Sequence, residues 1–497
     1  MNMRLKNCFP VYLLIFLMTA SCVVQENPVT GNKRAFAYSW DQEVQIGGEA
    51  DQEIAAEFGI YEDSELRDYV IRLSEEILEN SHMRREGTSE QFMETEFTFR
   101  VLDSPVVNAF ALPGGYVYVT RGLLAHLNNE AQLAVVIGHE IGHVAARHAS
   151  QRGLQQALGQ VAVVGGAILG QELLGVPGES LLNLSSQAAQ LLFLSYSRDH
   201  ERESDRLGVE YASRTGYDAA EGAEFFTSLK RISERSGGGI PNLLSSHPDP
   251  GERELNIPRM AQQWEEQGFD QRIRNTDTYM QRISGIVYGE NPRQGFARDG
   301  QFYHPDLEFQ FPVPSGWHVI NQPAQVVLVE PGEQAIMIFR IDFESDDARE
   351  SVQKFLADNE INADSQRAGQ SSNRYSAYEA EFTLRQNGQD YGFLIYAVEY
   401  GGRVYNFLNY TSQSAYSDFR PLFRSTTSGF NRVTNNSVLN IKPVTVSVRQ
   451  LNRAAVFQDL LPSSLPMDID PEEVAILNQV NLTDRLPAGT WIKIPTQ

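Results

Sequence analysis

The chain has 497 residues, a formal charge of −23 at pH 7 and 41% apolar residues. This length predicts about two to four domains, and the apolar content is sufficient for their cores. The acidic balance argues against nucleic acid and against the anionic face of a membrane as partners.

The N-terminus has the pattern of a targeting segment. Basic residues precede an apolar run, Val11–Met18, that is too short to span a bilayer, and Thr19-Ala20-Ser21-Cys22 follows. Residues 1–21 resemble a bacterial lipoprotein signal that is cleaved before Cys22, whose thiol is then acylated; a plain secretory signal with a different cut is the alternative. Because Cys8 would leave with the signal, no disulfide is expected. We therefore expect a periplasm-facing lipoprotein of the bacterial envelope, at the outer membrane.

Helices and a short sheet are predicted next. Residues 22–38 contain the turn-rich run Asn27–Asn32 and are expected to form a tether. Helical periodicity covers Trp40–Phe58 and Ser64–Asn80, and Phe97–Leu102 alternates as a strand.

Residues 108–119 predict a strand, a tight Pro-Gly-Gly turn and a second strand. A strand beside a metal-bearing helix is where an extended peptide can add itself through backbone hydrogen bonds. An ordinary hairpin is the alternative. If the strand binds substrate, the contacting residues are Asn108, Ala109, Phe110, Ala111, Gly114 and Gly115.

The most informative motif is His139-Glu140-Ile141-Gly142-His143, inside a helical pattern over Gln132–His148. Positions four apart lie one turn above each other, so His139 and His143 point to the same side of the helix. Two imidazoles placed in this way can hold one zinc ion, with Glu140 beside them to take a proton from a zinc-activated water. The alternative is a helix with two satisfied or surface histidines.

A zinc site of this kind needs a third protein ligand. His148 lies about 140° round the helix from His143, so we expect it to face away as a surface residue near the helix C-terminus. Glu201 and Asp205 share one face of a charged helical segment over Tyr196–Gly208. Glu201 could bind the metal while Asp205 accepts the N–H of a ligand histidine. The alternative is a salt-bridged, solvated face.

Together these motifs resemble the zinc metallopeptidase family (gluzincins) that includes HtpX, BepA, LoiP and the CAAX prenyl proteases, in its soluble lipoprotein branch. The resemblance covers Asn27–Ile257, about half the chain. It is carried by Asn108–Gly115, His139–His143 and Glu201–Asp205. It implies that Glu201 is the third zinc ligand and that Asp205 lies behind the site.

The same resemblance extends to Ser246-His247-Pro248 and Arg253. It implies that His247 lies near the zinc, either as a fourth ligand that holds the enzyme latent or as a hydrogen-bond donor to the oxyanion of the reaction. Arg253 would fix this loop by pairing with a carboxylate.

Two glycine-rich stretches lie between these motifs. Gly159–Gly170 is apolar and too short to span a membrane, so we expect a core helix or a hairpin over the cleft, with membrane contact as the alternative. Gly237–Gly239 is expected to be a mobile loop of a lid near His247.

From Gly285 the pattern changes to alternation with many aromatic residues. Phe393–Tyr400 and Arg403–Tyr410 flank Gly401-Gly402 as a hairpin. One strand face is predicted to carry Leu307, Phe309, Phe311 and Val313, and helices are predicted over residues 346–359 and 416–425. The opening Phe309–Trp317 is weakly similar to PsbP-like domains. His304 and His318 stand alone, so binding or spacing is the expected role.

The C-terminal stretches Ala475–Asn478 and Leu486–Pro495 resemble the second half of a LysM module, a peptidoglycan-binding fold. The first half lacks the usual Gly-Asp-Thr-Leu opening. Glycan binding and a purely structural cap therefore both remain open.

The predicted fold class is multidomain α+β. It comprises a mostly helical zincin-type peptidase domain with a small β-sheet, an antiparallel α+β sandwich-like domain and a small C-terminal module. The expected boundaries are signal peptide 1–21, tether 22–38, zinc metallopeptidase domain 39–284, PsbP-like domain 285–436 and LysM-like module 437–497.

The predicted function is a zinc-dependent endopeptidase with one Zn²⁺ per chain, held by His139, His143 and Glu201. Glu140 acts as general base and His247 assists or gates. On family grounds the substrates are misfolded or stalled envelope proteins. Membrane contact is expected only through the lipid anchor, with peptidoglycan contact through the C-terminal module and no nucleic acid. The alternative is a latent or non-catalytic, zinc-stabilised assembly or binding factor.

Overall fold

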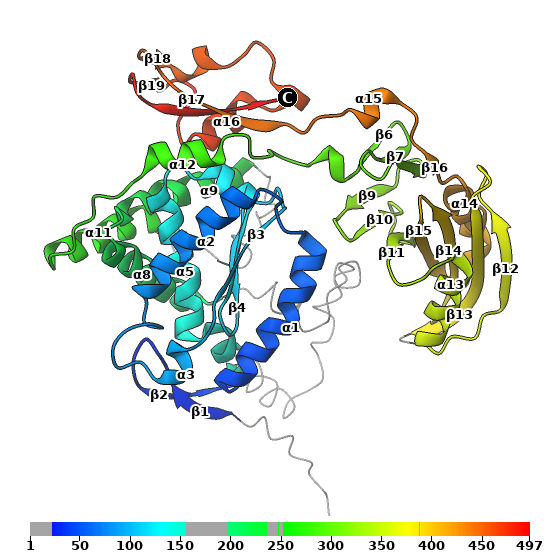
Figure 1. The fold of residues 1–497 in the computed structure, drawn as a ribbon, viewed down its shortest axis with the longest axis horizontal. Coiled ribbons are helices and arrows are strands. Elements are labelled where there is room, and N and C mark those ends of the chain that lie inside the picture. The colour runs from blue at the N-terminus through cyan, green and yellow to red at the C-terminus, as the bar shows by residue number, and fades with distance from the viewer. Residues whose placement is uncertain (1–21, 156–195, 236–246, 248–251, 387) are drawn as a thin grey trace, which may run out of the picture.

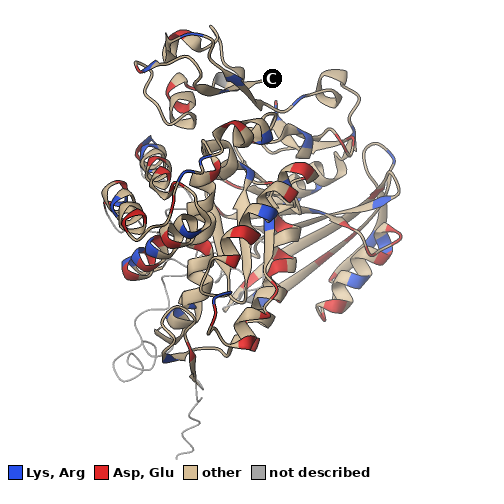
Figure 2. Cartoon of the chain, turned by 60° about the vertical axis from the view of Figure 1, so that its left-hand side comes forward, with Lys and Arg blue, Asp and Glu red and all other residues tan. Residues whose placement is uncertain are grey.

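The computed structural model describes residues 22–155, 196–235, 247, 252–386 and 388–497 (Figure 1). Gly159–Gly170, expected to form a core helix or a hairpin, and Gly237–Gly239, expected to form a lid loop, lie outside the described residues. Within the described part, none of the helices combines the length and the apolar character that a membrane crossing needs. Figure 2 shows acidic residues interspersed with basic ones along the helices.

Helices form most of the first half of the chain. The predicted helices before the His139–His143 motif are confirmed to within one residue. The helices are α1 (Trp40–Phe58), α2 (Ser64–Glu79), α3 (Glu90–Met93), α4 (Arg121–His126), α5 (Glu130–Ala146), α8 (Arg198–Thr215), α9 (Gly222–Arg235), α11 (Arg253–Glu266) and α12 (Thr276–Ile283).

Helix α5 is the central element of this half. All of its residues are buried, so it is surrounded by other elements rather than lying on the surface. The Asn129 side chain accepts a hydrogen bond from the backbone N–H of Gln132 and caps its first turn. The helix ends at Ala146, because Arg147 adopts a left-handed conformation with φ 58° and ψ 41°.

A three-stranded sheet packs beside α5. Its strands are β3 (Thr98–Leu102), β4 (Ala109–Leu112) and β5 (Tyr116–Thr120), in the order β3-β5-β4. Strand β5 runs parallel to β3 and antiparallel to β4, which confirms the predicted strand, turn and strand. In the turn, Gly114 has φ 80°, and a Cβ there would lie 2.4 Å from the Cα of Val44 on α1. The turn therefore needs glycine where α1 crosses it.

The predicted tether is instead a β-hairpin. Strands β1 (Val23–Glu26) and β2 (Lys33–Phe36) pair in antiparallel register. Asn27, in the connecting turn, donates a hydrogen bond of 3.0 Å from its side chain to the carbonyl of Ala146 at the end of α5. The turn residues predicted a tether, but one of them, Asn27, caps the C-terminal end of the central helix.

Antiparallel strands dominate the next part of the chain, as predicted. A seven-stranded sheet has the order β12-β13-β14-β15-β11-β10-β9, and a four-stranded sheet has the order β16-β8-β7-β6. The strands are β6 (Phe296–Arg298), β7 (Gln301–His304), β8 (Phe309–Pro312), β9 (His318–Asn321), β10 (Gln325–Val329), β11 (Ala335–Asp342), β12 (Ser365–Gln370), β13 (Ser376–Gln386), β14 (Gln389–Tyr400), β15 (Arg403–Ser412) and β16 (Asn431–Arg432). Helices α13 (Ala348–Asp358) and α14 (Tyr416–Ser428) accompany them.

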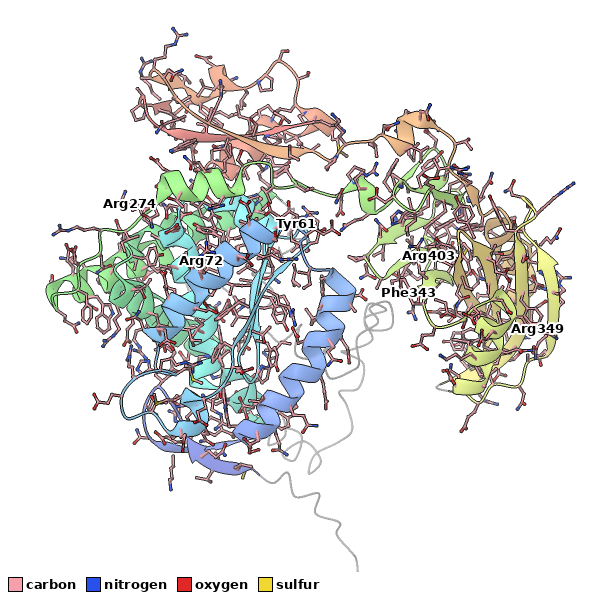
Figure 3. The ribbon with its side chains drawn as sticks, viewed as in Figure 1. Tyr61, Arg72, Arg274, Phe343, Arg349 and Arg403 are labelled. Carbon is pink, nitrogen blue, oxygen red and sulfur yellow. The ribbon has the colours of Figure 1, made fainter. Side chains whose placement is uncertain are left out.

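The glycine hairpin in this region is confirmed. Strands β14 and β15 pair around Gly401 and Gly402, whose φ values of 59° and 75° match a two-residue hairpin turn. Phe309 and Phe311 are buried in the aromatic core beneath the sheets. Phe343, labelled in Figure 3, is 82% exposed and lies outside that core.

The last part of the chain pairs β17 (Thr445–Gln450) with β20 (Trp491–Thr496), and β18 (Ala455–Val456) with β19 (Arg485–Leu486). Helix α15 (Asn436–Leu439) precedes these strands, and α16 (Pro471–Leu477) lies between them. The LysM resemblance stays a prediction.

This C-terminal part returns to pack on the helical part, against α4, α9 and α12. Figure 1 shows it beside α12 and α9. Val446 and Leu477 belong to the same apolar core as α5. Lys493 is fully buried and donates hydrogen bonds of 2.7 and 2.8 Å to the carbonyls of Ala125 and Leu127. In space, the β-rich part is therefore an insertion between two segments that share one core.

Replacement of Lys493 by Met should weaken this contact, because the carbonyls of Ala125 and Leu127 lose their donor. We expect the free energy of unfolding at about pH 10 to fall by about 2 kcal/mol. Urea denaturation of the full chain measures it. Lys442→Met, at an exposed position, is the control and should change stability by less than about 0.5 kcal/mol.

The pH dependence of this difference tests the burial of the amine. Burial lowers the pKa of Lys493 well below its ordinary value of 10.5. Between the lowered pKa of the folded state and the ordinary value of 10.5, the unfolded chain binds more protons than the folded chain. Lys493 therefore makes the free energy of unfolding of the wild type rise with pH. The difference in the free energy of unfolding between wild type and Lys493→Met should therefore shrink as the pH is lowered from about 10 to 7. A difference that is independent of pH would contradict this.

Candidate metal centre

Three predicted ligands lie together between α5 and α8. The Nε2 atoms of His139 and His143 are 3.0 Å apart; that of His139 lies 3.5 Å from Oε2 of Glu201, and that of His143 lies 3.5 Å from Oε1. Ligand atoms bound tetrahedrally to one ion at 2.0–2.2 Å would lie about 3.3 Å from one another. The three side chains are therefore close enough to bind a single metal ion.

His247 completes the group. Its Nδ1 lies 3.3 Å from Nε2 of His139 and 3.2 Å from Oε1 of Glu201. One ligand atom from each of His139, His143, Glu201 and His247 lies within 4.8 Å of all the others, and all four side chains are buried. Burying four such donors in contact is unfavourable without a cation or protons between them. This donor set could therefore hold a metal ion.

Glycine lets α5 and α8 approach closely enough to assemble the group. A Cβ at Gly208 on α8 would lie 2.8 Å from the carbonyl oxygen of Val135 and 2.9 Å from the backbone nitrogen of His139. Any side chain there would push the helices apart. Glu201 lies two turns before Gly208 on the same helix and is carried to the histidine pair by this contact.

Asp205 and Arg253 support the ligands from behind. Asp205 Oδ1 lies 3.0 Å from Nδ1 of His139. Arg253 donates hydrogen bonds of 2.8 Å to both Asp205 and Glu201. Burial would raise the pKa of Asp205, but the charge of Arg253 and the contact with His139 outweigh it and hold that pKa below its ordinary value. Burial would also raise the pKa of Glu201, but the neighbouring His247 and His139 outweigh it and hold that pKa well below its ordinary value.

Glu140 lies beside the donor group. Its Oε1 is 3.6 Å from Nε2 of His247, and its Oε2 is buried without a hydrogen-bond partner in the described part. Burial raises the pKa of Glu140. A carboxylate with a raised pKa accepts a proton more readily than an ordinary one.

The expectation for His148 was wrong. It was predicted to face away from the metal as a surface residue, but its side chain is fully buried and its Nδ1 lies 3.0 Å from Nδ1 of His143. The reason is that α5 ends at Ala146 and the left-handed Arg147 turns the chain, so the helical geometry does not extend to His148. Burial lowers the pKa of His148, which favours the neutral imidazole.

Two further residues at the site were not predicted. Glu203, for which the sequence predicted no role at the site, has Oε2 3.2 Å from Nε2 of His148. Tyr196 stacks on the ring of His143 with 4.1 Å between ring centroids. No local pattern could have found them, because the Glu203 contact depends on the turn at Arg147 and the Tyr196 contact joins segments distant in sequence.

The predicted substrate strand is β4, one of the two edge strands of its sheet. The backbone N–H of Asn108 donates to the Thr120 hydroxyl, which positions the strand against β5. Gly114 and Gly115 lie in the following turn. The six predicted substrate contacts, Asn108, Ala109, Phe110, Ala111, Gly114 and Gly115, are all buried, so a binding role for them stays a prediction.

Comparison with known proteins gives the family. Residues 73–260 match the pattern that defines Peptidase family M48. They are an M48 peptidase domain. The resemblance drawn from the motifs is thereby confirmed, and the chain carries a metalloendopeptidase domain.

Relatives of the M48 domain occur in bacteria and mitochondria. The chain is 30% identical over 241 residues to the beta-barrel assembly-enhancing protease of Yersinia pestis, covering 48% of this chain and 47% of that protein. It is 32% identical over 177 residues to the mitochondrial metalloendopeptidase OMA1 of Bos taurus, covering 34% and 33%. The chain spans about half the length of the beta-barrel assembly-enhancing proteases that it matches.

Among solved structures, cyanobacterial PsbP from Synechocystis sp. PCC 6803 matches 27% of this chain and 91% of that one, at 14% identity and a TM-score of 0.23. A score this low does not establish a shared fold. The PsbP-like resemblance of residues 285–436 stays a prediction.

Metal analysis tests the donor set. The purified full chain should retain about one equivalent of divalent transition metal after dialysis, and Glu201→Ala should lower the affinity by more than the ~10–100-fold typical of outer-shell changes. Glu210→Ala is the matched control, because this buried carboxylate on α8 pairs with Arg85 rather than with the donor group. Equal metal loss in both variants would contradict the assignment.

Proposed function

We propose that this protein is a zinc-dependent endopeptidase acting on proteins of the bacterial envelope. The observation that carries the proposal is a buried group of two helical imidazoles and one carboxylate with Glu140 beside it, inside an M48 domain. The group comprises His139, His143 and Glu201.

Zinc is the metal that suits these donors. Two imidazoles and one carboxylate are a donor set of catalytic zinc sites, which keep a further position for water or substrate. When bound, Zn²⁺ supplies Lewis acidity, lowering the pKa of a water and polarising a peptide carbonyl.

Glu140 performs the proton transfers in this mechanism. It takes a proton from the attacking water and returns it to the leaving amine as the peptide bond breaks. Two features support this role. Helix α5 holds Glu140 directly after the ligand His139, and burial raises its pKa.

His247 would control access to the site. Its Nδ1 belongs to the donor group, which supports the role of a fourth ligand that keeps the enzyme latent. Release of His247 would then free a position for substrate. Its other nitrogen lies on the side of Glu140, so a released His247 could also donate a hydrogen bond to the oxyanion.

Extended segments of envelope proteins, misfolded or stalled ones, are the proposed substrates, bound along β4 by backbone hydrogen bonds. The name of the Yersinia pestis relative, a beta-barrel assembly-enhancing protease, supports an envelope role.

We propose a lipid anchor at Cys22, which is exposed at the start of β1, and a periplasm-facing outer-membrane location. Peptidoglycan contact through residues 437–497 remains part of the proposal. The acidic charge disfavours nucleic acid.

The replacement Glu140→Gln tests the mechanism. It should leave zinc bound and lower the cleavage of an unfolded protein substrate by about 10²–10⁴-fold, because the general base is lost. Initial rates and zinc content of the same preparation are the measurements. Unchanged cleavage would rule out Glu140 as the base.

The alternative function, a latent or non-catalytic zinc-stabilised assembly or binding factor, is favoured by the place of His247 in the donor group. His247→Ala separates the possibilities. A faster initial rate than wild type supports latency, and a slower one supports oxyanion stabilisation. Absence of cleavage by both wild type and His247→Ala would favour the non-catalytic factor.

A further inference from the structure

A chain of polar contacts leads away from His143 on the side opposite the donor group. His143 Nδ1 lies 3.0 Å from Nδ1 of His148, and His148 Nε2 lies 3.2 Å from Oε2 of Glu203. The Ser204 hydroxyl lies 3.3 Å from the same Nδ1 of His148. Both histidines are buried, whereas the Glu203 side chain is 27% exposed and reaches the surface.

These contacts determine where the protons lie on the two rings. A carboxylate only accepts hydrogen bonds, so Glu203 requires the proton of neutral His148 to be on Nε2. Nδ1 of His148 is then an acceptor, which the Ser204 hydroxyl and Nδ1 of His143 both face. A hydrogen on Nδ1 of His143 avoids placing two nitrogen lone pairs against each other at 3.0 Å. Nε2 of His143 is thereby left with its lone pair, and this is the atom that faces His139 and Glu201.

Helix α8 supplies a carboxylate for each part of the site. Glu201 is the proposed ligand, and Asp205 lies 3.0 Å from Nδ1 of His139. Asp205 pairs with His139 and Arg253, and His148 connects His143 to Glu203. Ligand histidines in zinc sites usually have such a partner at the second nitrogen, and loss of the partner lowers metal affinity.

The place of His148 depends on the turn after α5. Arg147 is fully buried and donates hydrogen bonds to the Glu43 carboxylate on α1 and to the carbonyl of Tyr38. Its guanidinium lies 3.8 Å from the centre of the Phe36 ring on β2. These contacts hold the left-handed turn and direct the next side chain, His148, back toward the site. The ring of His148 also stacks on that of His200, with 4.3 Å between centroids.

We propose that His148 and Glu203 are positioning residues that fix the tautomer and the orientation of His143 for metal binding. This inference rests on the proposed zinc-dependent function. Neither residue touches the donor group's ligand atoms, and their effect passes through His143 Nδ1.

Zinc affinity is the measurement that tests this role. Metal-free full-length protein is titrated with zinc against a chelator of known affinity, so the readout does not depend on catalysis. His148→Leu removes the acceptor and should weaken zinc binding by about 10–100-fold. His148→Asn retains an oxygen at the position of Nδ1 but loses the contact with Glu203. It should bind zinc with an affinity between those of wild type and His148→Leu, as should Glu203→Ala.

A buried histidine elsewhere provides the control for a purely structural effect. His126→Leu removes an imidazole of the same size whose Nδ1 contacts the Gly122 carbonyl on α4 and which is not part of the donor group. It should lower stability but leave zinc affinity unchanged. If His148→Leu does not fold, Glu203→Ala, at a partly exposed position, still tests the positioning role.

The outcomes separate this inference from the proposed function. A wild-type chain that binds no zinc would overturn the proposed function. Zinc binding that is equally tight in wild type, His148→Leu and Glu203→Ala would overturn only the positioning role. Equal loss in His148→Asn and His148→Leu would also overturn it, because the retained acceptor should restore part of the affinity.

Discussion

The close approach of α5 and α8 is the contact on which the rest of the site depends. At Gly208 the two backbones are near enough that a single methyl group would collide with Val135 and His139. This contact brings the carboxylates of α8 to the histidines of α5. Glu201 enters the donor group, and Asp205 and Glu203 reach the outer nitrogens, one directly and one through His148.

Both ends of α5 are held by segments that are distant in sequence. At its C-terminus, Asn27 of the N-terminal hairpin donates to the carbonyl of Ala146, and Arg147 forms a buried ion pair with Glu43. At its N-terminus, Lys493 and the apolar residues of the C-terminal part pack on the preceding turn. A helix held in this way keeps its two ligand histidines at a constant separation. That rigidity is what a preorganised metal site requires.

Periodicity predicted the pairs of site residues whose relation is local, and the family resemblance supplied His247. His139 and His143 are one helical turn apart, and the same holds for Glu201 and Asp205, so periodicity alone places each pair on one face. His148 was predicted wrongly because the same periodicity was extended past the end of α5. The left-handed conformation of Arg147 results from contacts with Glu43 and Tyr38, which no local pattern contains. Glu203 was missed for the same reason.

The sequence by itself determined the elements with a strong local signal: helices α1, α2 and α5, the strands β4 and β5, the glycine hairpin of β14 and β15, and the motif of the M48 domain. Hydrophobic periodicity, capping residues and turn glycines act over a few residues, so they can be recognised without a fold. Only the tertiary structure decided that residues 22–38 form a hairpin on α5, that the C-terminal part returns to the helical core, and that His148 lies behind His143. Each of these depends on side chains that meet across more than one hundred residues or across a turn whose conformation such contacts impose.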